Sequence, residues 1–277
     1  WPRVTMFAGA ERMGEFLRAE MRWGDGDHRL RLGHVKVMLT CTTGALNPAF
    51  EDLCRLVQLA HQAGFPVAVH CIEQEAVRTV AEVFGEQRTA HRVPSGVTRR
   101  DRIEHCAECP PELVDLVRQS GATVVTQPGF IYWNGPNYRE RVTLSLQPHL
   151  YPAGALHHAG VAVAFGSDAP VIAPNPWPGI YSAVTRLAHD GHPVAVGGTG
   201  QTVDLDSALR MHTLAGALAE GTAADKGSIT PGKLADFVLV DSDPLATKPD
   251  LIKDIRPVLT ILGGEIVWED GRHEDSP

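Results

Sequence analysis

Three residues of the chain have side chains that bind metal ions, and each follows a short apolar run. They are His70, His105 and Asp168. A polar side chain buried without a partner is costly, so a polar residue at the end of a buried run needs something to bind. A lone histidine at a strand end is commonly structural. Two histidines and an aspartate that end separate strands of one parallel set instead predict most of a catalytic metal centre in a hydrolase.

Such a centre would activate water. A catalytic metal keeps one position open for a water molecule and lowers the pKa of that water from ~15.7 toward ~7, so that hydroxide is available at neutral pH. Nitrogen and oxygen ligands at a hydrolytic site make zinc the expected divalent ion, with one or two ions bound.

Lys36 lies within the apolar run 35–39, where a charged side chain needs an explanation. In one interpretation, the side chain extends past the end of a strand so that its ammonium group reaches water. In the other, the amine reacts with carbon dioxide to give a carbamate, an anionic ligand that can bridge two metal ions. Spacing alone leaves both interpretations open.

The apolar runs alternate along the chain with segments of helical periodicity. We expect strands at 35–39, 66–71, 102–106, 122–127 and 161–165, and no strand before the first helix. We expect helices at 11–23, 47–63, 73–84, 110–120, 180–188 and 205–218, and an irregular segment at 129–139. Strands that are apolar on both faces and alternate with helices are typical of a parallel sheet covered by helices.

Two α/β architectures fit this pattern, an open doubly wound sheet and a (β/α)8 TIM barrel. A doubly wound sheet usually carries a glycine-rich phosphate loop after an early strand, and the sequence has neither G-x-G-x-x-G nor G-x-x-x-x-G-K-[ST]. The polar residues gather instead at strand ends, where barrel enzymes place their chemistry. The sequence therefore favours the barrel.

The end of the chain has a different pattern. Three further strands are expected at 235–240, 257–262 and 265–268, and Gly263-Gly264 predicts a tight turn between the last two. We therefore expect two parts: residues 1–219 as a barrel domain and residues 220–277 as a small β domain.

Composition excludes several classes of protein. The 277 residues carry a net charge of −8 with scattered Lys and Arg, so neither nucleic acid nor an acidic membrane surface is an expected partner. No apolar run approaches the ~20 residues that span a bilayer, and no signal-peptide pattern is present. Cys106 and Cys109 form a C-x-x-C, but a structural zinc site needs four ligands, and no second pair exists. We expect reduced, packed cysteines in a cytoplasmic protein.

Several stretches resemble the amidohydrolase superfamily. They are Val67–His70, Arg102–His105, Phe165–Pro170 and, most specifically, the tail Gly227–Val238. Ile103-Glu104-His105 and Gln127-Pro128 resemble the family 3 subgroup, which contains N-substituted formamide deformylases. The resemblance implies a TIM barrel with a small β-sandwich, in which strands four to eight would be visible here.

The resemblance also implies roles for individual residues. The fourth, fifth, sixth and eighth strands of the family would supply Lys36, His70, His105 and Asp168 as metal ligands, with Lys36 carboxylated. Asp168 would also be catalytic, taking a proton from the attacking water and passing it to the leaving nitrogen. Proton transfer of this kind contributes about 10²–10⁴-fold to the rate.

Two departures from the family are clear. Its first strand carries a His-x-His pair, which this chain lacks, and five parallel strands cannot close an eight-stranded barrel. The chain is therefore expected to be the C-terminal part of a longer enzyme. In addition, Thr40–Gly44 follows Lys36 where the subgroup often has Asp-Gly, which weakens the case for carboxylation.

The expected function is hydrolysis of a C–N bond in a small-molecule amide, N-formyl compound or cyclic amide. A deaminase with a single metal and a truncated, non-catalytic homologue are the alternatives, and a homodimer is left open. Aromatic residues of the segment 130–139 could line a substrate pocket or form a packed lid, and Gln127 could bind a substrate carbonyl. Glu104 should face away from His105, because neighbours on a strand alternate.

Overall fold

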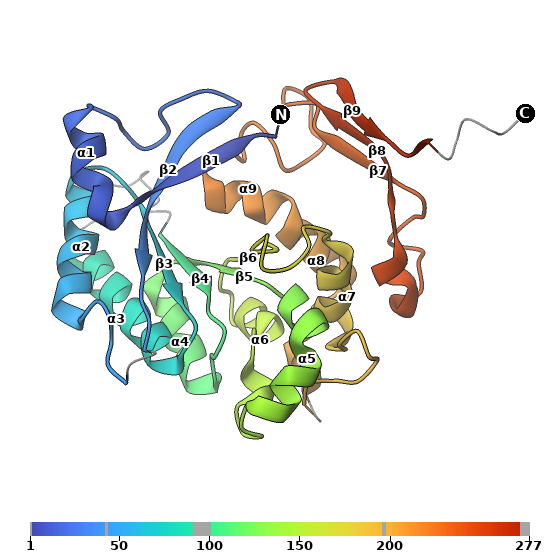
Figure 1. The fold of residues 1–277 in the computed structure, drawn as a ribbon, viewed down its shortest axis with the longest axis horizontal. Coiled ribbons are helices and arrows are strands. Elements are labelled where there is room, and N and C mark those ends of the chain that lie inside the picture. The colour runs from blue at the N-terminus through green and yellow to red at the C-terminus, as the bar shows by residue number, and fades with distance from the viewer. Residues whose placement is uncertain (1, 42–43, 91–100, 196–197, 272–277) are drawn as a thin grey trace, which may run out of the picture.

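The computed structural model describes residues 2–41, 44–90, 101–195 and 198–271. Six parallel strands form one sheet in the order of the sequence (Figure 1). They are β1 (Val4–Gly9), β2 (Leu30–Met38), β3 (Val67–Cys71), β4 (Arg102–His105), β5 (Thr123–Thr126) and β6 (Val163–Phe165). The fold is therefore a parallel α/β sheet, as the alternating pattern predicted.

Nine α-helices occur in the described residues. They are α1 (Met13–Arg18), α2 (Phe50–Gln62), α3 (Gln74–Ala90), α4 (Pro111–Ser120), α5 (Gly129–Arg141), α6 (Ala153–His158), α7 (Trp177–Thr185), α8 (Leu205–His212) and α9 (Leu214–Glu220). Short 3-10 helices lie at Ala10–Arg12, Gln147–His149, Gly198–Gln201 and Pro249–Asp254. In Figure 1, α2, α3 and α4 lie together along one side of β3 and β4.

One row of apolar side chains crosses the sheet and fixes its helix-covered face. Val37, Val69, Ile103, Val124 and Val163 are successive partners in the register of β2 to β6. Each is at most 5% exposed. Burying such a side chain contributes about 1.5–3 kcal/mol, so this row strongly favours the observed register over a slip by one residue.

The absence of a strand before the first helix was a wrong expectation. Strand β1 pairs with β2 in parallel, and the helical part of the expected segment 11–23 is limited to the 3-10 turn and α1. The run Val4–Gly9 is short and its apolar Val4 and Met6 stay largely exposed at the sheet edge, so it lacks the double-sided burial by which the other strands were found.

The bounds of several expected helices also differ from the structure. The helices expected at 73–84 and 180–188 are α3 and α7, and α6 was not expected. The helix predicted to begin at Pro48 begins at Phe50. The helix predicted at 205–218 is broken at Thr213, whose φ of −118° and ψ of −89° separate α8 from α9.

The expected irregular segment 129–139 is the helix α5. Its Gly, Asn and Pro residues suggested a loop, yet Pro136 lies inside the helix, and Phe130, Ile131 and Gly135 are buried. A side chain at Gly135 would collide with Ala188, so glycine allows α5 to pack closely there. Tertiary packing has overridden local propensity in this segment.

The end of the chain forms a separate three-stranded antiparallel sheet. Its strands are β7 (Phe237–Val240), β8 (Pro257–Leu262) and β9 (Glu265–Glu269). Gly263 and Gly264 have φ of 64° and 88° and form the expected tight turn between β8 and β9. The predicted strands of this part are confirmed, whereas the second layer of a sandwich stays a prediction.

Closure of the barrel also stays a prediction. β1 and β6 are the outer strands of the large sheet, and within the described ranges they pair only with β2 and β5. The helices of those ranges include none that is long and apolar enough to cross a membrane.

A hydrogen-bonded ion pair connects the start of the chain to the small sheet. Arg3 donates from Nε to Asp236 Oδ2 at 2.6 Å and from Nη2 to Oδ1 at 2.9 Å, and the Gly263 N–H donates to Oδ1 at 2.8 Å. These contacts, Arg3 first, hold the pKa of the Asp236 carboxyl below its ordinary value of 3.8.

Asp236→Asn should lower the free energy of unfolding by roughly 1–2 kcal/mol at pH 7, because charged hydrogen bonds are lost at a partly exposed site. A depressed folded-state pKa gives stability that is present above the unfolded value and lost as pH falls through the folded one. The difference between wild type and variant in urea unfolding should therefore shrink below pH 4. Asp206→Asn, in the exposed pair with Arg210, should cost less than about 0.5 kcal/mol. A difference for Asp236 that persists unchanged at pH 3 would contradict this account.

Candidate metal centre

The second face of the large sheet carries polar residues on β2 to β4, whereas Val125 and Ala164 on β5 and β6 pack there against Ala219 of α9. Partners in the register place His70 beside Met38 on one side and Glu104 on the other. Lys36 lies one side-chain layer lower, in the row that contains Ala68 and Arg102. Lys36, His70 and Glu104 therefore share the face opposite the apolar row, near the carboxyl ends of β2, β3 and β4.

Glu104 was expected to face away from His105, and this expectation was wrong. Glu104 follows the strand alternation, whereas His105 departs from it. The register pairs His105 with Cys71, which would direct its side chain toward the helices. His105 instead has φ of 71° and Cys106 has φ of 50°, both in the left-handed region. Each such residue costs about 1–3 kcal/mol, and this cost is commonly found at functional sites.

The left-handed turn brings the two histidine rings together. The ring centroids of His70 and His105 lie 4.5 Å apart, with an interplanar angle of 74°. Phe130, in the first turn of α5, lies nearly parallel to His105, with centroids 6.5 Å apart and an angle of 12°. The structure thus confirms that the ends of β3 and β4 place two imidazoles side by side.

Gln127 holds the His105 ring from the neighbouring strand. Its Oε1 lies 2.8 Å from His105 Nδ1, and its Nε2 donates to the Val125 carbonyl at 3.3 Å. Both side chains are buried. The sequence left open a hydrogen bond between Gln127 and a substrate carbonyl. The observed contacts are with His105 and Val125, and the substrate contact stays a prediction.

Burial, with the charges around it, favours the neutral form of His70. Burial lowers the pKa of His70 to about 4, helped by His105 and Lys36 and opposed by Glu104. A histidine must be neutral to bind a metal, so this environment is suited to a ligand at neutral pH.

Lys36 faces the same group of charges. Burial lowers its pKa from the ordinary 10.5, with Arg102 acting in the same direction and Glu104 and Asp168 opposing. A lysine that is uncharged more often is a better nucleophile toward carbon dioxide. Carboxylation of Lys36 nevertheless stays a prediction.

Asp168 follows β6 and lies at the surface. It comes three residues after the end of β6, has φ of 56° and is exposed. Over the ranges that the structure describes, no three His, Cys, Asp or Glu residues are grouped so that they could hold one ion. The structure therefore brings His70 and His105 together, while ligand roles for Asp168 and Lys36 stay predictions.

An ion pair that sequence reasoning missed lies beside the histidines. Arg102 donates to the two carboxylate oxygens of Glu104 at 2.7 and 3.1 Å, and its guanidinium lies 5.0 Å from the centre of the Phe7 ring. The i, i+2 spacing of Arg102 and Glu104 on one strand was the available signal. Both carboxylate oxygens of Glu104 thus accept hydrogen bonds from Arg102.

The cysteines match the expectation of reduced, packed residues. All five are free, and Cys71, Cys106 and Cys109 are buried. A hydrogen bond with Cys109, together with burial, raises the pKa of the Cys106 thiol.

The aromatic residues of α5 divide into two groups. Phe130 contacts His105, whereas Tyr132 packs edge-on against Tyr181 and Trp133. Trp133 is 42% exposed. A role in binding substrate therefore stays a prediction, and the segment's structure is a helix.

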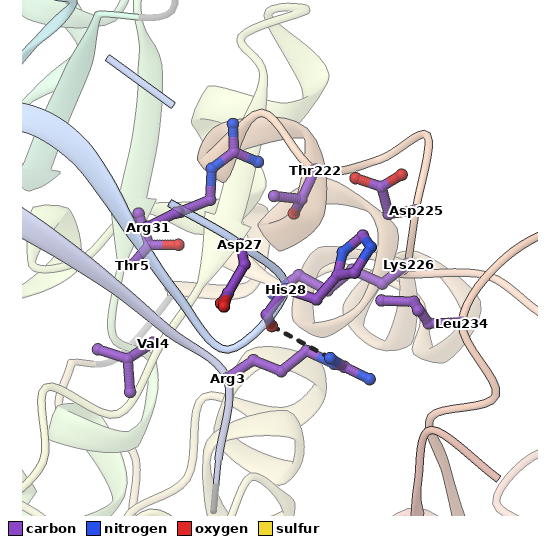
Figure 2. Close-up of a pocket in the computed structure, with 10 residues that line it drawn as sticks. All are labelled: Arg3, Val4, Thr5, Asp27, His28, Arg31, Thr222, Asp225, Lys226 and Leu234. Carbon is purple, nitrogen blue, oxygen red and sulfur yellow. Dashed lines mark hydrogen bonds between the residues drawn. The ribbon is translucent and has the colours of Figure 1, made fainter. Parts of the chain in front are cut away.

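A small crevice lies near the amino ends of the strands, away from the histidine pair. Figure 2 shows it between the start of β1, the residues before β2 and the segment after α9. Arg3 donates to the His28 carbonyl there, and Lys226 forms an ion pair with Glu220. Its basic groups are thus largely engaged by the protein itself, and barrel enzymes place their chemistry at the opposite end.

Fold and site together define an α/β protein with paired imidazoles at the carboxyl edge of a parallel sheet. The model of the amidohydrolase family matches residues 3–268, and the chain belongs to this family. This confirms the resemblance seen in the sequence.

Curated proteins and solved structures are also similar to this chain. The chain is 26% identical over 220 residues to an N-substituted formamide deformylase of Arthrobacter pascens, a match that covers 76% of this chain and 38% of that protein. It is 28% identical over 221 residues to a 5-methylthioadenosine/S-adenosylhomocysteine deaminase of Teredinibacter turnerae, covering 78% and 46%. An uncharacterized metal-dependent hydrolase from Pyrococcus horikoshii has a similar fold, with TM-score 0.75, 23% identity and coverage of 90% and 52%. The chain spans about two fifths of the length of the first curated relatives that it matches, 40% and 38%.

Glu104→Gln should lower the free energy of unfolding by about 2–3 kcal/mol, because it leaves the half-buried Arg102 without its charged partner. Urea unfolding at pH 7 measures this. Asp115→Asn is the matched control, since its pair with Arg118 is exposed, and it should cost less than about 1 kcal/mol. Equal losses in the two variants would show that the Arg102–Glu104 pair has no special weight.

Proposed function

We propose that this chain forms part of a metal-dependent hydrolase that cleaves the C–N bond of a small amide, N-formyl compound or cyclic amide. The observation that carries the proposal is the pair His70 and His105 at the carboxyl edge of the sheet, 4.5 Å apart between ring centroids. Membership of the amidohydrolase family supports the class of reaction.

The donor chemistry of the pair fits a divalent ion. The Gln127 Oε1 atom lies against His105 Nδ1, so the lone pair of His105 Nε2 is available for a metal. This arrangement is typical of metal-binding histidines. Two imidazole nitrogens suit zinc, which takes nitrogen and oxygen ligands at hydrolytic sites. The ion, when bound, supplies a water of lowered pKa.

Further donors are needed beyond the two histidines, because catalytic zinc commonly has three protein ligands. We assign Lys36, as a carbamate, and Asp168 to this role. The influence of the Asp168 charge on the pKa of Lys36 supports their proximity to one another. Asp168 would also take the proton of the attacking water and pass it to the leaving nitrogen, which contributes about 10²–10⁴-fold.

The names of two relatives support the substrate class. The printed name of the Arthrobacter protein supports an N-formyl or related amide. The Teredinibacter relative supports a second candidate, deamination of a ring C–N bond with a single metal. A third candidate, a non-catalytic homologue, draws its support from the absence of a His-x-His pair in the sequence.

Metal binding tests the centre directly. His70→Ala and His105→Ala should each weaken zinc binding by at least about tenfold, because even changes to groups behind the ligands cost 10–100-fold. Zinc titration of the metal-free full chain, followed by elemental analysis, measures this. His158→Ala removes an exposed histidine and should bind zinc as the wild type does. Wild-type zinc affinity in the His70 and His105 variants would sink the assignment.

Turnover separates the three candidates. The zinc-loaded protein should release formate and an amine from N-formyl compounds and should open the ring of cyclic amides to give amino acids. Asp168→Asn should lower kcat by about 10²-fold or more. Ammonia release from an aminated ring with one bound ion would favour the deaminase. Metal binding without turnover on any of these substrates would favour the non-catalytic homologue.

A further inference from the structure

We infer that Gln127 is a positioning residue that holds His105 as the tautomer with its proton on Nδ1 and its lone pair on Nε2. The inference about the tautomer stands on the hydrogen bonds alone. Its consequence for metal affinity rests on the proposed function.

The orientation of the Gln127 amide is determined by its second contact. Nε2 donates to the Val125 carbonyl at 3.3 Å. The reverse orientation would set the amide oxygen against that carbonyl, and two acceptors cannot form a hydrogen bond. The amide nitrogen therefore faces Val125 and the amide oxygen faces His105.

The tautomer of His105 follows from that orientation. Gln127 Oε1 can only accept, and it lies 2.8 Å from His105 Nδ1. Nδ1 must therefore carry the hydrogen, which in a neutral imidazole leaves Nε2 without one. The alternative tautomer would oppose a nitrogen lone pair to an oxygen lone pair at hydrogen-bond distance.

Because both side chains are buried, the hydrogen bond between Gln127 and His105 determines the tautomer of His105. Gln127 is 3% exposed and His105 is 6% exposed, so bulk water offers little replacement for either partner. Gln127 itself follows β5 directly and lies two residues beyond Val125, which is the register partner of Glu104. The left-handed conformation of His105 brings its ring to this side of the sheet, where Gln127 and Phe130 both contact it.

The consequence is a pre-set ligand atom. A histidine whose Nδ1–H is held by an oxygen presents Nε2 to a metal in a fixed direction, and loss of such a partner costs 10–100-fold in metal affinity. Gln127 would thus influence metal binding without touching metal or substrate.

The tautomer can be read in the metal-free full chain from the ¹⁵N shifts and long-range couplings of the imidazole nitrogens at pH 8. The His105 signals are those that disappear in His105→Asn. The wild type should show His105 protonated at Nδ1. Gln127→Leu should shift His105 toward the Nε2–H form. Gln127→Glu loses the donor to the Val125 carbonyl but keeps an acceptor oxygen for Nδ1, so it should keep the Nδ1–H form.

Gln147→Leu is the matched control. Gln147 is also a buried glutamine, but its Nε2 donates to the carbonyls of Arg139 and Val142. Removing its amide tests the general cost of losing a buried glutamine, and the His105 signals should not change.

Zinc titration gives the second measurement. Gln127→Leu should bind zinc 10–100-fold more weakly than the wild type, with Gln127→Glu and Gln147→Leu close to the wild type. An Nε2–H tautomer in the wild type, or an unchanged Nδ1–H tautomer in folded Gln127→Leu, would overturn the inference. The wild-type spectrum decides the first point even if a variant does not fold. A correct tautomer in a chain that binds no zinc would uphold the role of Gln127 and reject the proposed function.

Discussion

Parallel register between the central strands determines on which face of the sheet Lys36, His70 and Glu104 lie. The row from Val37 to Val163 is buried under the helices, so the opposite face must carry the side chains that alternate with it. A slip of one residue would bury Lys36, His70 and Glu104 against the helices and expose the apolar row. The energy that keeps the core dry thus also keeps these polar residues at one edge of the sheet.

His105 is the exception that completes the arrangement. Strict alternation would separate it from His70, and its left-handed backbone, together with that of Cys106, reverses this. Gln127 and Phe130 then hold the ring, which offsets part of the backbone cost. Arg102 neutralises the carboxylate of Glu104, which lies next to His70 in the register, so the chain itself balances this charge near the histidines.

The sequence was sufficient for much of the fold because its central strands are apolar on both faces. It did not reveal β1, whose edge position leaves apolar residues exposed, or α5, whose Gly and Pro residues are compensated by packing that no local pattern records. Residue types identified His70 and His105. Their approach depends on a positive φ at a non-glycine residue, His105, so it could not be deduced from alternation. Gln127 was singled out, but its partner lies on another strand.

The central claim is that His70 and His105 bind one metal ion, and anomalous diffraction at the zinc edge tests it most directly. Crystals of the metal-free chain soaked in zinc should give a peak within bonding distance of both imidazoles, about 2.0–2.1 Å from each nitrogen. Crystals of His105→Asn treated in the same way should lose that peak. A zinc peak bound elsewhere in the wild type, with none at the two imidazoles, would contradict the account.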